Sequence, residues 1–135
     1  MRVRPGDRIG ILALNSIAYL EAELATWAAQ AVTVPMNIRW SIAENAYAVE
    51  DSDIRLPFVD RNFRAEADAL RQKSEDLIIV GMDDMGAAGD ETIEDMIASH
   101  ERAPELDPDP AALAASSTRA ERRVIPWASC CHTLQ

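Results

Sequence analysis

Apolar residues near the start of the chain fall into two short runs separated by a longer amphipathic segment. The run Arg8–Leu14 follows a Pro-Gly-Asp turn and has the continuous apolar character of a buried parallel strand. Asn15 or Ser16 is placed to cap the helix that follows. The apolar side of that helix is predicted to consist of Leu20, Leu24, Trp27, Ala28 and Ala31. Val32–Pro35 is the next strand, so the pattern predicts a βαβ unit with a right-handed crossover.

The alternation of strands and helices continues to about residue 100. Ser41 and Glu44 have the spacing of a capping box, which begins a helix that should extend to about Val49. The other predicted elements are strands at Ile54–Val59 and Leu77–Val80 and helices at Asn62–Lys73 and Thr92–His100. This order predicts an α/β fold with an open, mainly parallel sheet flanked by helices.

Domain boundaries follow from the prolines near residue 104. Residues 1–103 are predicted to form one α/β subdomain. Residues 104–115 contain Pro104, Pro108 and Pro110, cannot continue a helix, and are predicted to be a linker. Residues 116–135 are predicted to be an unstructured tail.

Composition and charge narrow the classes of partner. A chain of 135 residues with 48% hydrophobic content can bury one modest core. Its formal net charge of -10 argues against nucleic acid or an anionic membrane surface as a partner. No apolar run approaches the roughly 20 residues that span a bilayer. The amino-terminal residues also lack the apolar stretch of a secretory signal, which predicts a cytoplasmic location.

One long stretch carries a family resemblance. Gly6–Ser52 reads GDRIGILALNSIAYLEAELATWAAQAVTVPMNIRWSIAENAYAVEDS. Phe58–Asp60, the apolar strand that ends at Gly81, and Pro104–Leu113 continue the pattern in register. This ordered series resembles the amino-terminal subdomain of AMP-dependent acyl-CoA synthetases, the adenylate-forming ligases. The resemblance implies part of the adenylate-forming fold.

Activity and cofactors are implied by the same resemblance. The family uses ATP and Mg²⁺ to convert a carboxylic acid, such as a fatty acid, to an acyl-adenylate, and then transfers the acyl group to coenzyme A. In such enzymes this region is scaffold and part of the acyl-pocket wall, while the phosphate-binding loop and later catalytic motifs follow it. We therefore expect no catalytic, cofactor-binding or metal residues in this chain, no bound cofactor, and a truncated ligase that is inactive alone.

The codons near the carboxyl terminus support a frameshift. Read from the third base of each codon, the stretch from Ser117 to Val124 permits YTGGTTG, and the stretch from Trp127 to Thr133 permits GVMLSH. Those strings resemble the family's phosphate-binding signature. The shifted frame lacks the usual lysine before GVMLSH, because the Pro126-Trp127 junction allows only Leu, Met or Val.

Three residues depart from the family pattern in ways that affect folding. Gln30 stands where a glycine usually ends the helix, and a left-handed non-glycine residue there costs about 1 kcal/mol. Asn45 replaces an apolar residue, at a cost on the order of 1–3 kcal/mol if it is buried without a partner. Pro57 lies inside the predicted third strand, where it removes a ladder donor.

The candidate site residues have simpler structural interpretations. The neighbouring acids are predicted to be solvated surface groups and not a cation or acid/base site; they are Asp83, Asp84, Glu91, Glu94 and Asp95. Cys130, Cys131 and His132 are too few and too close for a zinc site, which needs about four spaced ligands.

The remaining candidates are also assigned to structure. His100 should be an exposed partner of a helix dipole, and Trp27 and Trp40 should pack. Asn37 and Arg39 should fix a loop by hydrogen bonding, and Gly81 alone is too weak a signal for a phosphate loop.

Two other functions stay open. A small interaction module, or a homo-oligomer, would bind a partner through the unpaired edge of the sheet. A stand-alone nucleotide binder would instead give measurable heat on titration with ATP and Mg²⁺.

Overall fold

A single mixed sheet organises the chain, with strand order β5-β4-β3-β1-β2-β6-β7. The computed structural model describes residues 3–73, 76–83, 89–101, 113–116 and 124–126. All neighbouring strands are parallel except β6 and β7, which are antiparallel. The strands are β1 (Arg8–Leu12), β2 (Val32–Pro35), β3 (Leu56–Val59), β4 (Val80–Gly81), β5 (Glu91–Thr92), β6 (Leu113–Ser116) and β7 (Val124–Pro126). The helices are α1 (Ile17–Ala28), α2 (Ile42–Asp51), the 3-10 helix η1 (Arg61–Phe63), α3 (Arg64–Lys73) and α4 (Ile93–Ser99).

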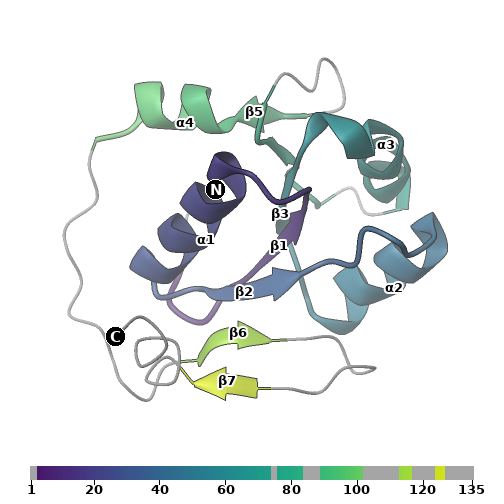
Figure 1. The fold of residues 1–135 in the computed structure, drawn as a ribbon, viewed down its shortest axis with the longest axis horizontal. Helices are drawn as coiled ribbons and strands as arrows, with labels where there is room; N and C mark the ends of the chain where they lie inside the picture. Colours follow the sequence, from purple (N-terminus) through teal and green to yellow (C-terminus); the bar gives the residue numbers. More distant parts are fainter. Residues whose placement is uncertain (1–2, 74–75, 84–88, 102–112, 117–123, 127–135) are drawn as a thin grey trace.

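Helices cover both faces of the sheet (Figure 1): α1 and α4 lie on one side and α2 and α3 on the other. The central strand β1 is buried on both faces, since Ile9 and Ile11 pack toward α1 and α4 while Leu12 packs toward α2 and α3. Gly10 lies on the α2 side, where an added Cβ would come 3.2 Å from Ile54 and from the Met36 sulfur. The predicted α/β fold with a mainly parallel sheet is therefore confirmed.

Side-chain caps set the helix ends as the sequence predicts. Ser16, one of the two predicted caps, accepts a hydrogen bond from the Tyr19 N–H at 3.1 Å. Ser41 and Glu44 form the predicted capping box, and the two hydrogen bonds from Ser41 lower the pKa of the Glu44 carboxyl. The helix begun there extends to Asp51, slightly beyond the predicted end.

The buried face of α1 is opposite to the predicted one. Ala22 and Thr26 are buried against the sheet, whereas Leu20 and Leu24 are each about half exposed. The prediction failed because α1 carries apolar residues on both sides, and periodicity favours the larger ones. The small side chains let the helix approach the sheet closely, and the Thr26 hydroxyl is satisfied by the Ala22 carbonyl at 2.7 Å.

Both α1 and α2 end in a left-handed residue that is not glycine. Gln30 has φ 55° and Asp53 has φ 51°. In α1 the Gln30 N–H donates to the Trp27 carbonyl and the Ala31 N–H to the Thr26 carbonyl, which is the hydrogen-bond pattern of a Schellman motif. The left-handed conformation inferred for Gln30 is thus confirmed. Glutamine occupies a position at which glycine would adopt the same backbone conformation with less strain.

Pro57 lies inside β3 and is buried, as expected. The β4 side of β3 receives N–H groups from Ile78 and Met82, at the carbonyls of Arg55 and Val59. Pro57 lies midway between them with no N–H to donate. Regular pairing accordingly begins at Val80 and not at Leu77, where the fourth strand was predicted to start.

Asn45 is buried with incomplete hydrogen bonding. Its side chain is 1% exposed, and its amide donates to the Trp40 carbonyl at a long 3.4 Å. The Asn45 side-chain oxygen has no partner among the described residues. The expected cost of a polar group at this apolar position therefore applies to its acceptor.

The prediction of a linker and an unstructured tail is wrong at two short strands. Leu113–Ser116 (β6) pairs with β2, and Val124–Pro126 (β7) pairs with β6, so the free edge of β2 orders these residues. Residues 104–112, 117–123 and 127–135 lie outside the described residues, so for them that prediction stays a prediction.

Replacing Gln30 by glycine should stabilise the fold. Glycine adopts φ 55° without the steric cost borne by glutamine, so Gln30→Gly should raise the free energy of unfolding by about 1 kcal/mol. Urea denaturation followed by circular dichroism measures the change. Gln30→Ala is the control, because alanine keeps the Cβ and should give no stabilisation; equal gains in both variants would contradict the assignment.

Candidate functional site

The carboxyl edge of β1 and β3 is where a ligand site would be expected in this topology. The chain leaves β1 for α1 on one face of the sheet and leaves β3 for α3 on the other (Figure 1). Open α/β sheets bind their ligands in the crevice that such a reversal creates. The residues that flank this crevice are Leu14, after β1, and Asp60, after β3.

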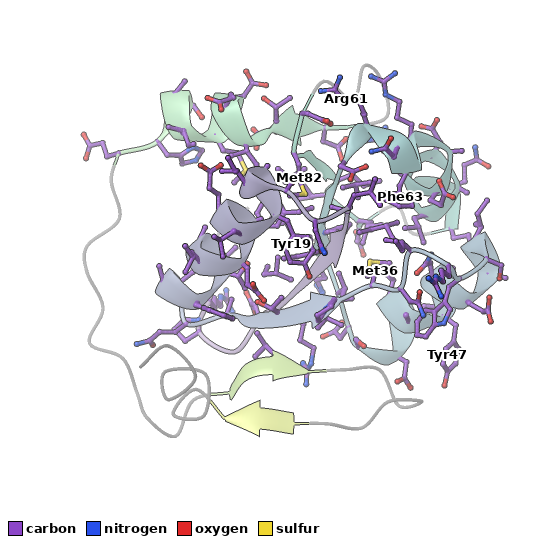
Figure 2. The ribbon with its side chains drawn as sticks, viewed as in Figure 1. Tyr19, Met36, Tyr47, Arg61, Phe63 and Met82 are labelled. Carbon is purple, nitrogen blue, oxygen red and sulfur yellow. The ribbon has the colours of Figure 1, made fainter. Side chains whose placement is uncertain are left out.

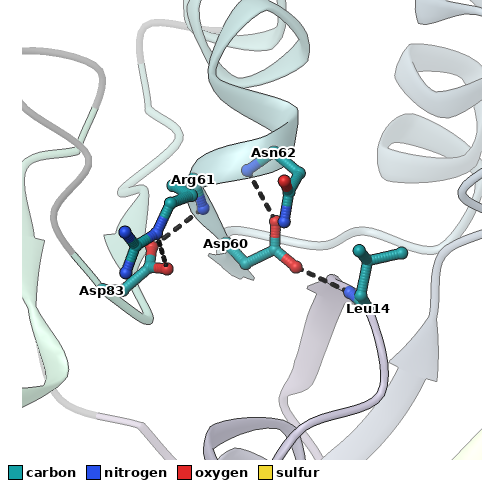
Figure 3. A network of polar contacts seen from close by, with 5 residues as sticks. All are labelled: Leu14, Asp60, Arg61, Asn62 and Asp83. Carbon is teal, nitrogen blue, oxygen red and sulfur yellow. Dashed lines mark hydrogen bonds and ion pairs between the residues drawn. The ribbon is translucent and has the colours of Figure 1, made fainter.

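Asp60 joins the two strand ends at this switch point with hydrogen bonds to the backbone (Figure 3). One carboxylate oxygen accepts from the Leu14 N–H at 2.6 Å, and the other accepts from the Asn62 N–H at 2.8 Å. The Asp60 N–H itself donates to the Leu12 carbonyl at 3.2 Å. Asp60 is 8% exposed, so it acts as a buried bridge between the ends of β1 and β3 and as the cap of η1.

A second carboxylate links the ends of β3 and β4. Asp83 accepts from the Arg61 N–H at 2.8 Å and from the Arg61 Nε at 2.6 Å, as Figure 3 shows. The Asp83 side chain is 28% exposed and the Arg61 side chain 61%. The Asp83 carboxylate binds both the backbone N–H and the guanidinium of Arg61, so it connects the residues that follow β3 and β4.

The acids near the fourth strand were predicted to be solvated surface groups. The structure confirms this for some of them and shows a bound partner for others. Glu91, Glu94 and Asp95 are exposed, and Asp95 forms a capping box with Thr92 at the start of α4. Asp83 is engaged by Arg61, which was not foreseen, and Asp84 lies outside the described residues. Within the described ranges no three His, Cys, Asp or Glu side chains are grouped so as to hold a metal ion.

The remaining predicted residues lie apart from the Asp60 bridge. The Asn37 side chain accepts from the Arg39 N–H at 2.9 Å, which is a loop-fixing contact. His100 is exposed at the end of α4 with its Nδ1 3.0 Å from the Met96 carbonyl. Gly81 is buried in β4.

The last candidates are two tryptophans and a carboxyl-terminal cysteine–histidine group. Trp27 and Trp40 are half-buried, as expected of residues that pack. Cys130, Cys131 and His132 lie outside the described residues.

Tyr19 and Glu23 form a half-buried pair one turn apart on α1. Burial raises the pKa of the Tyr19 hydroxyl, and the nearby Glu23 carboxylate raises it further. Burial also raises the pKa of the Glu23 carboxyl. A tyrosine with a raised pKa stays protonated at neutral pH, so this pair offers no activated nucleophile.

A hollow of about 270 Å³ lies at the opposite, amino-terminal edge of the sheet. Its lining includes Asp53 and Asp76 with Arg55, and Asp53 and Arg55 are an exposed ion pair 3.6 Å apart. Its apolar lining is limited to Val49, Ile54 and Leu77, and the charged groups at its rim are exposed, whereas ligand pockets enclose their ligands in mainly apolar walls.

Removing one acceptor of the Asp60 bridge should destabilise the fold. In Asp60→Asn the side-chain amide nitrogen cannot accept, so one of the two backbone N–H groups loses its partner at a cost of about 1–3 kcal/mol. Urea denaturation measures the loss. The matched control is Asp53→Asn, an exposed position with φ 51° that asparagine tolerates well, and its stability should be unchanged. Equal effects of the two variants would refute a bridging role for Asp60.

Within the described ranges, no helix has both the length and the apolar character that crossing a membrane requires.

Similarity to known proteins agrees with this architecture. A feruloyl-CoA synthase from an Amycolatopsis species is 48% identical over 50 residues, which are 37% of this chain and 10% of the relative. The fold resembles that of coronafacic acid ligase from Pectobacterium brasiliense, with a TM-score of 0.79, 19% identity, and coverage of 91% of this chain and 25% of that one. A benzoate CoA ligase from Burkholderia xenovorans LB400 gives a TM-score of 0.73 at 17% identity, over 84% of this chain and 22% of that one.

The chain thus spans about a tenth of the length of its curated relative and about a quarter of these structures. A family model described as AMP-binding enzyme matches residues 1–117, most of the chain. The family resemblance inferred from Gly6–Ser52 is therefore confirmed, and the chain belongs to the family of AMP-binding enzymes.

Proposed function

We propose that this chain is the amino-terminal part of an ATP-dependent acid–CoA ligase. The family match over residues 1–117 supports the reaction class, in which a carboxylic acid is activated as an acyl-adenylate and then passed to the thiol of coenzyme A. ATP, Mg²⁺ and coenzyme A are the cofactors that this reaction needs. The relative named feruloyl-CoA synthase favours an aromatic acid, with a fatty acid as the other substrate to test.

Within that enzyme, the chain serves as scaffold. The observation that carries this assignment is the Asp60 bridge, because both carboxylate oxygens at the switch point already accept backbone N–H groups. Asp60 is only 8% exposed, and two backbone N–H groups already hold its oxygens, so it has little access to magnesium or to a substrate proton. The predicted absence of catalytic, cofactor-binding and metal residues, and the cytoplasmic location, belong to this proposal.

Pyrophosphate exchange tests the proposal. The purified 135-residue chain, given ATP, Mg²⁺ and either ferulate or a fatty acid, should catalyse no acid-dependent ATP–pyrophosphate exchange. Titration with ATP and Mg²⁺ should likewise give no binding heat. The Amycolatopsis feruloyl-CoA synthase is the positive control under the same conditions.

Sequencing of the gene provides a second test of the proposal. A gene that continues in the shifted frame beyond the codon for Ser117 should encode the later ligase motifs. Saturable exchange by the 135-residue chain would contradict the scaffold role. A shifted frame without those motifs would contradict the frameshift.

A further inference from the structure

The two carboxyl-terminal strands cover an edge of the sheet that would otherwise be open. β6 pairs with the free side of β2, and β7 pairs antiparallel with β6. Figure 1 shows β7 as the outermost strand, beyond β6 and apart from the helices. A partner was expected to bind through an unpaired sheet edge, but on this side the chain pairs with itself.

β6 and β7 differ in how well each protects an exposed edge. β6 has four residues, Leu113 to Ser116, with no charge and no proline. β7 has three residues, its pairing with β6 is irregular between Leu113 and Ala115, and Pro126 has no N–H group to donate. Short length, irregular pairing and proline are features by which natural edge strands avoid pairing with another chain. β7 is therefore suited to be an edge strand, and β6 is not.

The opposite edge of the sheet is protected in a similar way. β5 consists of Glu91 and Thr92 only, and Glu91 is charged and exposed. Two residues offer little backbone to a second chain, and a charged side chain opposes pairing. Among the strands that the structure describes, β6 is thus the one that would become an unprotected edge if its neighbour were lost.

We propose that β7 shields β6 from a second copy of this chain, and that release of β7 lets two copies join edge to edge through β6. This edge of β6 already accepts an antiparallel strand, so a second β6 can replace β7 without a change of strand direction. Pairing about a two-fold axis would place Leu113 of one copy opposite Ser116 of the other. The proposal concerns self-association and is independent of the proposed function.

Tethering favours β7 over a second copy. Because β7 belongs to the same chain as β6, its effective concentration at the β6 edge is on the order of millimolar. A second copy must also approach against the formal net charge of -10 that each chain carries. The unaltered chain should therefore be monomeric, and association after release of β7 should increase with salt, which screens the charges.

The helices and the described core do not depend on β7. The three hydrophobic clusters among the described side chains are formed by residues between Val3 and Met96. The core side chains of Met36, Phe63 and Met82 lie well apart from β7 (Figure 2). Release of β7 should thus expose β6 and leave the helices folded.

Two prolines in β7 test the proposal in the full-length chain. Val124→Pro together with Ile125→Pro leaves β7 without any N–H group to donate to β6. In sedimentation the unaltered chain should have the mass of a monomer, and this variant should approach about twice that mass as protein and sodium chloride concentrations rise. The matched control is Ala128→Pro together with Ser129→Pro, which adds the same two prolines after β7 and should stay monomeric.

Hydrogen exchange identifies the surface that associates. In the β7 variant, the β6 amides that face β7 should lose protection at low protein concentration and regain it when two copies associate. Circular dichroism should show the same helix content as in the unaltered chain. This combination of results supports the proposal.

Every other outcome overturns the proposal. A β7 variant that stays monomeric at all concentrations, or an unaltered chain that is already a dimer, would show that β7 does not shield β6. Association of the control to the same extent, or oligomers in which the β6 amides stay unprotected, would place the contact elsewhere. Loss of the helical signal in the β7 variant would show that β7 is required for the fold and is not a cover.

Discussion

Short parallel strands leave backbone N–H groups at their ends, and in this chain aspartate side chains accept them. Asp60 joins the end of β3 to the Leu14 N–H after β1. Asp83 joins the end of β4 to Arg61 after β3. On the far side of β4, Asp90 accepts from the Ile79 N–H at 2.8 Å and donates its own N–H to the Ile79 carbonyl. An unpaired buried amide costs about 1–3 kcal/mol, so these links decide whether the strands hold their register.

This use of carboxylates limits what the region does in catalysis. An acidic chain offers many Asp and Glu residues of the type that serves metal or proton chemistry. Each of the three aspartates at the strand ends instead accepts a hydrogen bond from a backbone N–H group. Asp83 also pairs with the Arg61 guanidinium, and Asp90 pairs with Arg71 at 2.9 Å. The links between strand ends therefore make this region a structural frame.

Many of the helix ends in this fold could be predicted from the local sequence. The cap at Ser16 and the capping box at Ser41 depend on spacing alone, so they were predicted correctly. The left-handed Gln30 followed from the family resemblance. The buried side of α1 was not readable, because choosing between two apolar sides requires knowing how close the sheet lies and what else covers the helix.

Other features depended on tertiary partners. The shortening of β4 is linked to Pro57, which lies on a different strand. Asp60 had a usable signal, since an aspartate directly after a strand and before a short helix often caps that helix. Its bond to Leu14, 46 residues away in sequence, had no such signal, because only the sheet order brings the two together.

Native-state hydrogen exchange at the Leu14 amide tests this account most directly. If the Asp60 bridge holds the ends of β1 and β3 together, this amide should exchange only through global unfolding, as slowly as the Asp60 amide bonded to Leu12. The amide of Ile38, a residue of an exposed loop, provides the fast reference. Exchange of the Leu14 amide at the rate of the Ile38 amide, in a chain whose strand amides stay protected, would contradict the central claim.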